Sequence, residues 1–428
     1  MHIDWIHWVR SLHPPELFSI LGVLLLVDGT RYALSAVCMV LFDLGQESWR
    51  LLLRRSAPRR QYHYCPAVTV LIAGHNEADT IEATLRSLWN SYPRLEIVVV
   101  DDGSTDGMAA VARNFAQSRQ GIQILSRPER GGKSSALNWG LARSRAEVIV
   151  TLDADSRLAQ HAIWEIVQPL QQPHVGAVSG TITVWNAFRN LTTWLQAYEY
   201  RQSIFLGRRL QARLGTLGIV SGAFGAYRRQ LLAQLQGWDA GSGEDGDLTL
   251  RIRKAGYQIA FAPEGECLTN APESWTRLFR QRLRWDRAVV TFECRKHVDL
   301  AKFWQRHFQL DNFLLVSERW LFNVAFVFGY WTGLIWLGVM HQEHFWKILL
   351  LLYAGQLCLE AISVSTLLFY SNRRWRDLEL ALAVPFVPLY QAFLKVVDLT
   401  ALLDELTLRK SYQDNYVPQH VRQATWKW

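Results

Sequence analysis

The sequence predicts an α/β domain with a mainly parallel sheet, set between long apolar helices. Short apolar runs of strand length alternate with amphipathic segments from Val68 to Leu152, and this alternation is typical of a parallel sheet covered on both faces by helices. Apolar stretches of membrane-spanning length occur on both sides of this region. A chain of 428 residues also exceeds a typical single domain, so we expect one soluble core with attached apolar segments.

The first apolar stretch, Leu17 to Phe42, predicts an amino-terminal membrane anchor. It is too long for the core of a signal peptide, and no small-residue cleavage site is evident after it. Basic residues follow it, as expected where a helix leaves the bilayer on the cytoplasmic side: Arg50, Arg54, Arg55, Arg59 and Arg60. Because the basic residues form no long tract, we interpret the net charge of +8 as a sign of membrane topology and expect no nucleic-acid partner.

Strands and helices are expected in turn along the α/β region. The predicted strands are 68–73, 96–100, 122–125 and 148–152, and the predicted helices between them are 78–90, 105–117 and 134–144. Ligands of such sheets bind beyond the carboxyl ends of the strands. Functional residues should therefore lie in the turns that follow the strands.

Polar residues follow the first two predicted strands. Asn76 and Glu77 come after the first, and a run that includes Asp102, Gly103 and Ser104 comes after the second. A carboxylate at a strand end can accept hydrogen bonds from a ribose or a base, while the glycine permits a tight turn and the serine can cap a helix. An ordinary turn into a helix explains the same residues.

The next two turns carry a glycine pair and a pair of aspartates. Gly131, Gly132 and Lys133 open a helix, so their backbone can approach a diphosphate and the lysine adds a full charge. The spacing is not that of a Walker loop. Asp153 and Asp155, around one spacer, can hold a divalent ion directly or through water. The alternative is that Asp155 caps a helix and Asp153 is incidental.

These four turns, in this order, resemble those of the family 2 inverting glycosyltransferases. The resemblance covers about Val68 to Arg287 and implies a GT-A, Rossmann-like domain that binds a nucleotide sugar. It implies that uridine is contacted by Asn76, Glu77 and Asp102. It further implies that Lys133 contacts the diphosphate region, and that Asp153 and Asp155 bind the nucleotide and Mg2+ or Mn2+.

A later acidic motif supplies a candidate catalytic base. Glu244, Asp245 and Asp247 open a helix that ends near Gly256, and an inverting transfer needs one base to take the proton of the acceptor hydroxyl. Asp245 matches the base of the family. Asp247 is the competing carboxylate, and capping of the helix is the structural alternative.

Gln281, Arg284 and Trp285 form a QxxRW pattern. Arg284 can clamp phosphate oxygens of the donor, Gln281 can hydrogen-bond a sugar, and the indole of Trp285 offers a flat face for a pyranose. The same helix, 275–292, also suits a membrane surface, as does 191–214. QxxRW ahead of membrane helices resembles the processive cellulose, hyaluronan, nodulation chitooligosaccharide and poly-N-acetylglucosamine synthases. By the same resemblance, Ser221 and Gly222 line the acceptor terminus.

Three further apolar stretches, Asn312 to Met340, Trp346 to Tyr370 and Leu378 to Val397, are each long enough to span a membrane. The third contains Pro385 and Pro388, which predict a bent or re-entrant segment followed by an interfacial helix. We therefore expect an anchor and basic segment at 1–60, a cytosolic GT-A domain with interfacial helices at 61–300, and a membrane region with a basic tail at 301–428. The five cysteines form no CxxC pair, which agrees with a reducing cytosol.

The sequence as a whole predicts a multi-pass inner-membrane synthase in a bacterium. It would extend a β-linked glycan from UDP-glucose or UDP-N-acetylglucosamine, in contact with the lipid bilayer and with accessory export proteins. Two alternatives remain. One is a nonprocessive glycosyltransferase acting on a lipid carrier, and the other is a catalytically silent subunit of an export complex.

Overall fold

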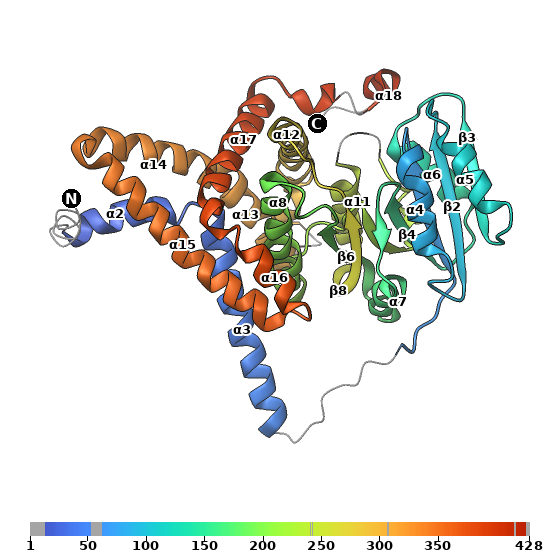
Figure 1. The fold of residues 1–428 in the computed structure, drawn as a ribbon, viewed down its shortest axis with the longest axis horizontal. Helices are drawn as coiled ribbons and strands as arrows, with labels where there is room; N and C mark the ends of the chain where they lie inside the picture. Colours follow the sequence, from blue (N-terminus) through green and yellow to red (C-terminus); the bar gives the residue numbers. More distant parts are fainter. Residues whose placement is uncertain are drawn as a thin grey trace.

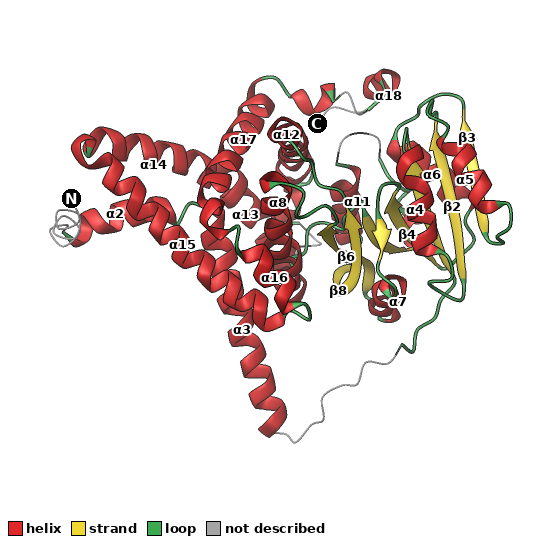
Figure 2. Ribbon diagram, viewed as in Figure 1, coloured by secondary structure: helices red, strands yellow, loops and turns green. Residues whose placement is uncertain are grey.

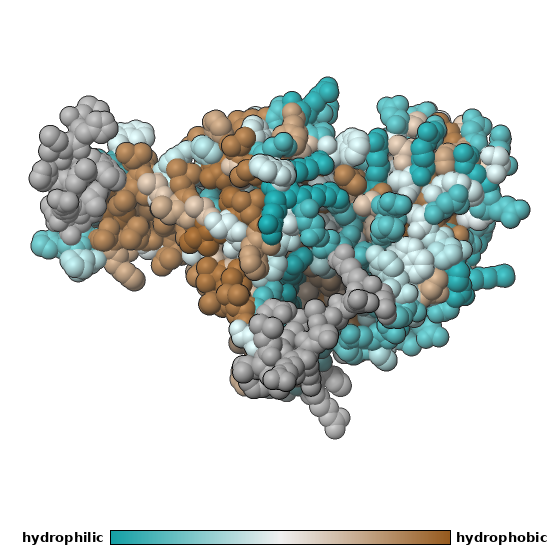
Figure 3. Space-filling view, turned by 60° about the horizontal axis from the view of Figure 1, so that its bottom comes forward, coloured by the Kyte–Doolittle hydropathy of each residue, from teal (hydrophilic) through white to brown (hydrophobic). Residues whose placement is uncertain are grey.

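The computed structural model describes residues 13–52, 62–239, 241, 243–305, 308–414 and 417–424. An α/β body fills one end of the molecule, and long helices from both ends of the chain fill the other (Figures 1 and 2). Apolar residues gather over the helical end, whereas polar residues cover most of the α/β body on the face shown in Figure 3. This division matches the predicted arrangement of one α/β core with attached apolar helices.

The first half of the sheet follows the predicted alternation. The elements are β1 (Val68–Gly74), α4 (Ala78–Leu88), β2 (Leu95–Asp102), α5 (Met108–Ala116), β3 (Ile122–Arg127), α6 (Lys133–Arg143) and β4 (Val148–Asp153). These strands pair in parallel in the order β3-β2-β1-β4. Both faces are buried, because Val70 and Ile72 of β1 belong to one core cluster and Leu71 to the other. The carboxyl ends of β1, β2 and β4 therefore lie along one edge.

The second half of the sheet is mixed, so the expectation of a mainly parallel sheet holds only for the first half. Its strands are β5 (Arg157–Leu158), β6 (Val175–Val184), β7 (Phe224–Arg228) and β8 (Gln258–Thr269). β7 is antiparallel to both β4 and β6, while β6 and β8 are parallel. Because Phe224 pairs with Leu152, the loop that precedes β7 lies beside the end of β4.

Helices on the faces of the sheet carry the later motifs. They are α7 (Ala162–Val167), α10 (Arg229–Gln234) and α11 (Glu244–Lys254). Both predicted interfacial helices are present. The first consists of α8 (Leu191–Tyr200), the π-helical segment η2 (Arg201–Gly207) and α9 (Arg208–Arg213). The second is α12 (Trp275–Thr291), which continues as a π-helical segment, η3 (Phe292–Lys296). The side chains of Asn190 and Ser274 cap the starts of α8 and α12.

Within the described ranges, three helical segments are long and apolar enough to cross a membrane: Leu310–Met340, Gln342–Tyr370 and Arg374–Thr407. They comprise α13 (Leu310–Trp320), α14 (Phe326–Met340), α15 (Phe345–Tyr370), α16 (Arg374–Ala381) and α17 (Val387–Thr407). Pro385 lies in the break between α16 and α17, and Pro388 lies in the first turn of α17. A 3-10 turn, Val384–Phe386, interrupts the helix at the prolines, but Arg374–Thr407 as a whole is one apolar segment long enough to cross a membrane. The predicted bent or re-entrant course stays a prediction.

The two ends of the chain complete the helical part. α2 (Pro14–Leu24) and α3 (Asp28–Leu52) form a pair bent by 89°, which would count as a fourth span if the pair is one span. Arg54, Arg55, Arg59 and Arg60 lie outside the described residues. After α17, the short helix α18 (Gln419–Ala424) lies next to α6 of the α/β body (Figure 1).

Buried polar contacts join the α/β body to the helical part. Arg201 donates two hydrogen bonds, of 2.9 and 2.7 Å, to the buried carboxylate of Asp377 in α16. Glu360 of α15 is fully buried and accepts hydrogen bonds from Tyr198 of α8 and Gln391 of α17. Buried charges and amides are tolerated only when their partners are fixed, so these contacts hold α8 against α15, α16 and α17.

Candidate active site

Asp102, the last residue of β2, fixes the glycine turn that leads into α6. Both carboxylate oxygens of the buried Asp102 accept backbone N–H groups, from Gly131 at 2.8 Å and from Gly132 at 2.7 Å. Gly132 has φ +85°, a conformation that favours glycine. The carboxylate predicted to contact uridine therefore fixes the predicted diphosphate turn, and its direct contact with a nucleotide stays a prediction.

Asn76, the first predicted donor residue, links the first two turns. Its side-chain oxygen accepts the N–H of Thr105 at 2.8 Å, and its own N–H donates to Ser104 at 2.9 Å. Asn76 has φ +60°, a left-handed conformation that asparagine adopts more readily than most residues. The turns after β1 and β2 thus form one connected surface at the sheet edge.

Lys133 lies among the carboxylates of two other predicted motifs. Its ammonium group contacts Asp153 at 2.6 Å and Glu244 at 3.6 Å. Burial alone would lower the pKa of Lys133, but the charges of Asp153, Glu244 and Asp245 outweigh this effect and raise its pKa. The lysine therefore stays protonated and ties the glycine turn to the end of β4 and the start of α11.

The carboxylates around Asp155 fit a divalent ion. Burial, together with the charges of Asp153 and Glu77, raises the pKa of Asp155 to about 6, which shows that this carboxylate lacks sufficient compensating positive charge. Burial, followed by the nearby carboxylates that include Asp153, also raises the pKa of Glu77. Within the described part of the chain, no group of three or more His, Cys, Asp or Glu residues is suited to hold a metal by itself. A Mg2+-type site needs only one or two carboxylates when substrate phosphates supply the other ligands.

Asp245 and Asp247 have opposite surroundings, although they share the first turn of α11. Oδ2 of the partly exposed Asp245 accepts the N–H of Gly222 at 3.0 Å, and Oδ1 accepts the N–H of Gly246 at 2.8 Å. Asp247 is fully buried on the other side. Only Asp245 is therefore placed to receive a proton from a substrate.

Asp247 is held by three basic side chains. It contacts Arg251 at 2.8 Å, Lys296 at 2.7 Å and His297 at 2.8 Å. Burial alone would raise the pKa of Asp247, but the hydrogen bond to His297 and the charges of Arg251 and Lys296 outweigh it and lower the pKa. A carboxylate stabilised in this way is too weak a base to serve in proton transfer near neutral pH, which removes it as the competitor of Asp245.

Ser221 and Gly222 lie between the lysine cluster and Asp245. A β-carbon at Gly222 would come within 3.1 Å of Nζ of Lys133 and 3.4 Å of Oδ2 of Asp245, so this close approach requires glycine. The N–H of Ser221 donates to Oγ of Ser179 in β6 at 3.4 Å. The small-residue loop predicted to meet the acceptor is therefore next to the predicted base.

The QxxRW helix, α12, packs against the start of α11. A β-carbon at Gly243 would meet Ala288 at 2.8 Å and Phe292 at 3.0 Å, and Ala288 lies one turn beyond Trp285. Trp285 is 36% exposed, and the guanidinium of Arg282 lies over its indole ring. The amide oxygen of Gln281 is buried and accepts no hydrogen bond from the described residues, as expected if its donor comes from a ligand.

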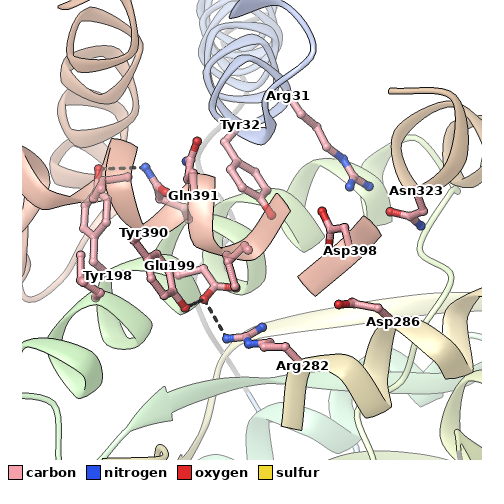
Figure 4. A pocket seen from close by; sticks show the side chains of 14 residues that line it. Arg31, Tyr32, Tyr198, Glu199, Arg282, Asp286, Asn323, Tyr390, Gln391 and Asp398 are labelled. Carbon is pink, nitrogen blue, oxygen red and sulfur yellow. Dashed lines mark hydrogen bonds and ion pairs between the residues drawn. The ribbon is translucent and has the colours of Figure 1, made fainter. Parts of the chain in front are cut away.

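A polar cavity of about 160 Å³ lies on the side of α12 that faces the apolar helices (Figure 4). Arg282 points into it, stacks on Trp285 with its guanidinium carbon 4.7 Å from the ring centroid, and donates to Glu199 at 2.7 Å. None of the predicted donor residues lines the cavity. Its other polar lining comes from α3, α8, η2, α12, η5 (Leu321–Ala325) and α17: Arg31, Tyr32, Tyr198, Gln202, Asp286, Asn323, Tyr390, Gln391 and Asp398.

Several residues of the site were not expected from the sequence. Glu244 was considered only as a helix cap, yet it faces Lys133. Asn138 holds the loop ahead of α11 through both N–H and C=O of Trp238, at 2.9 and 2.7 Å. The ring of Pro418 lies against Gly132. The acidic spacing around Glu244 could have revealed its role, but contacts between residues about 100 positions apart leave no signal in a single sequence.

These features match a known family. Residues 69–236 match the family described as Glycosyl transferase family 2, so this part of the chain carries a domain of the family 2 glycosyltransferase type. The chain is 32% identical over 278 residues to the probable glycosyltransferase YdaM of Bacillus subtilis (strain 168), covering 63% of this chain and 64% of that protein.

Other relatives are poly-beta-1,6-N-acetyl-D-glucosamine synthases. The synthase of Staphylococcus epidermidis is 28% identical, over 55% of this chain and 57% of that protein, and the synthase of Staphylococcus aureus (strain MSSA476) is 30% identical, over 51% and 53%. The chain thus spans less than two thirds of the length of these relatives. Its synthase-type sequence and GT-A fold agree with the predicted class.

The fold is shared with a solved structure of another glycosyltransferase. The mannosyltransferase PcManGT from Pyrobaculum calidifontis, solved in complex with GDP-Man and Mn2+, superimposes with a TM-score of 0.58 at 22% identity. The similarity covers 88% of this chain and 99% of that chain. It therefore extends beyond the α/β body into the helical part and supports the predicted fold class.

Proposed function

We propose that this protein is a membrane-embedded, inverting glycosyltransferase that extends a β-linked glycan from a UDP-sugar. One observation carries the proposal. Asp245 is fixed by the N–H of Gly222 at 3.0 Å, where the Lys133–Asp153 cluster meets the small-residue loop. A base next to both a donor cluster and an acceptor loop is what direct displacement at a sugar carbon requires.

The reaction follows from this arrangement. An acceptor hydroxyl attacks the anomeric carbon from the face opposite the diphosphate, and Asp245 takes the hydroxyl proton. The new C–O bond forms as the bond to the diphosphate oxygen breaks, and the electron pair leaves with UDP. Lys133 supplies a cation at the glycine turn, where the amino terminus of α6 also favours phosphate.

A divalent cation, Mg2+ or Mn2+, belongs to the proposal. The carboxylates of Glu77, Asp153 and Asp155 repel one another, as the raised pKa of Asp155 indicates, and the diphosphate would add further negative charge. When bound, such an ion neutralises charge on the departing diphosphate. Asp153 and Asp155 are the residues proposed to hold it, and calorimetric titration of Mn2+ into the protein with UDP and without donor sugar would measure its binding.

The polar cavity supports continuation of the glycan into the helical part. It lies beside Trp285, the proposed platform for the acceptor sugar, and its lining includes residues of α3 and α17. A polar cavity that borders apolar helices has no purpose for lipid contact alone. We therefore propose that the protein lies in the inner membrane with its α/β body in the cytosol. We further propose that export of the glycan is coupled to its synthesis and involves accessory proteins.

The test is transfer by the purified full-length protein with UDP-N-acetylglucosamine, UDP-glucose and GDP-mannose in turn. We expect UDP release and products of many sugars from one UDP donor. One sugar per acceptor would instead identify a nonprocessive enzyme acting on a lipid carrier, and no transfer from any donor would identify a silent subunit. In sealed vesicles with the α/β body outside, polymer found only outside would contradict coupled export.

A further inference from the structure

One partly buried arginine near the proposed base has no acidic partner among the described residues. Arg208, at the start of α9, donates from Nη1 to Oγ of Ser179 at 2.8 Å. Within the described residues this is its only hydrogen bond, and it forms no ion pair. Its neighbour Arg209 differs, because its guanidinium stacks on the rings of Phe205 and Tyr370, with 4.7 and 5.2 Å to the centroids.

Arg208 is set deep in the molecule and still has free surface. Burial lowers its pKa to about 10, although the charge of Asp245 acts in the opposite direction. Its side chain is nevertheless partly accessible. A guanidinium carries five N–H donors, and within the described residues Arg208 uses one of its nitrogens on Ser179. The remaining N–H groups can donate to a ligand.

A short chain of hydrogen bonds connects Arg208 to the reacting end of the site. Oγ of Ser179 accepts both from Arg208 and from the N–H of Ser221, and the next residue, Gly222, donates to Asp245. Ser179 lies in β6 and pairs with Gly225 of β7. Since β7 and β4 separate β6 from β1 and β2, Arg208 lies on the side of Asp245 away from the predicted nucleotide turns.

We propose that Arg208 binds the acceptor sugar, donating its free N–H groups to a hydroxyl or N-acetyl carbonyl oxygen next to the hydroxyl that Asp245 deprotonates. This inference rests on the proposed function. The acceptor is favoured over the diphosphate for two reasons: Lys133 and the glycine turn already provide cationic and N–H donors for phosphate, and Arg208 adjoins the small-residue loop instead. A neutral, oxygen-rich sugar satisfies the donors of the guanidinium without bringing a second charge.

The experiment compares Arg208→Gln with wild type and with the matched control Arg209→Gln, all as full-length protein. A β-1,6-linked N-acetylglucosamine oligosaccharide is the acceptor probe, and its binding is measured without donor by isothermal titration calorimetry. UDP binding with Mn2+ is measured in the same samples. Steady-state kinetics then give separate KM values for the oligosaccharide and for UDP-N-acetylglucosamine.

Arg208→Gln should weaken oligosaccharide binding and raise the acceptor KM by about tenfold or more, the effect of losing a charge-assisted hydrogen bond. UDP affinity and the donor KM should change less than about twofold, and Arg208→Lys should recover part of the loss because it keeps the charge without the planar fork. Arg209→Gln should bind the oligosaccharide as wild type does.

Three results would overturn the proposal. Wild-type oligosaccharide affinity in Arg208→Gln would show that the guanidinium does not contact the acceptor. A loss of UDP affinity with unchanged acceptor binding would move Arg208 to the donor side. Equal loss of both affinities in Arg208→Gln and Arg208→Lys would indicate a purely structural role. If the wild-type protein transfers sugar from no donor, the proposed function itself is refuted. If the wild-type protein transfers sugar but substitution of Arg208 changes nothing, only the proposal for Arg208 is refuted.

Discussion

At the scale of single residues, the sequence spacing of Asp245 and Asp247 does not tell which of the two can act as a base, whereas their surroundings in the fold do. Asp245 and Asp247 are two positions apart and chemically identical in the sequence, yet one is partly exposed beside Gly222 and the other is fully buried among basic side chains. A base must keep access to the substrate, and its ionised form must not be stabilised by buried cations. The choice between them was therefore made by tertiary contacts.

Replacing Asp245 by Asn should remove proton transfer while leaving donor binding intact. We expect kcat to fall by about 10² to 10⁴-fold, the usual contribution of a general base, with UDP affinity unchanged. Rates of UDP release and calorimetric titration of UDP measure the two quantities. Glu82→Gln, at an exposed carboxylate paired only with Arg86 across one helical turn, is the control and should keep full activity. A D245N protein with wild-type kcat would show that the base lies elsewhere.

Replacing Lys133 by Met should weaken UDP binding, because the ammonium that contacts Asp153 at 2.6 Å would be lost and its carboxylate partners would be left to repel the diphosphate. We expect at least a tenfold rise in the Kd of UDP, since interactions with charged groups contribute about 1.5–3 kcal/mol. Lys254→Met, at a surface pair with Asp299, is the control. Unchanged UDP affinity in K133M would rule out a role in donor binding.

At the scale of elements, α11 is positioned by contacts from two directions. Through Asp247 it is tied to Lys296 and His297, which follow the QxxRW helix. Through Arg251, whose guanidinium also donates to the backbone oxygens of Leu235 and Gly237, it is tied to the loop that precedes it. Asp245, the proposed base, is therefore on a helix fixed relative to both α12 and the loop that precedes α11.

Asp247→Asn should destabilise the α/β body by about 3 kcal/mol or more, because it leaves buried cations without their counter-charge. The pKa of Asp247 is lowered in the fold, so its stabilisation is fully present above its ordinary pKa of 3.8 and is lost as pH falls through the folded-state value.

Between pH 7 and 9 the loss of unfolding free energy in D247N should therefore be constant. Denaturant unfolding followed by tryptophan fluorescence measures it at each pH. A difference that vanishes within this range would mean that the carboxylate is not ionised in the fold.

At the scale of the whole molecule, the position of the catalytic part against the apolar helices depends on a few buried polar contacts. The bidentate pair of Arg201 and Asp377 joins η2 to α16, and Glu360 of α15 accepts hydrogen bonds from Tyr198. These contacts fix the polar cavity beside Trp285. A product path from the acceptor site into the helices requires this alignment.

Asp377→Asn should loosen α16 from the α/β body. Breaking one partner of a buried pair costs about 3–5 kcal/mol, so limited proteolysis in the turn at 371–373 should become faster. The double variant Arg201→Met with Asp377→Leu removes both charges and should recover most of the protection. Proteolysis as slow in D377N as in wild type would show that the pair does not hold the two parts together.

The sequence by itself determined the strand and helix order from Val68 to Asp153, the candidate donor and acceptor motifs, and the apolar spans, because these follow from local periodicity and from motifs whose members are close in the chain. It did not reveal β7, a five-residue strand with a glycine and no clear alternation. Only the tertiary structure showed that the Gly222 loop lies beside Asp245, that the carboxylate of Asp102 binds the backbone of the glycine turn, and that Arg208 contacts Ser179. Those positions depend on contacts between segments that are far apart in the chain. The local residue pattern of a single sequence does not indicate which distant segments will pack together.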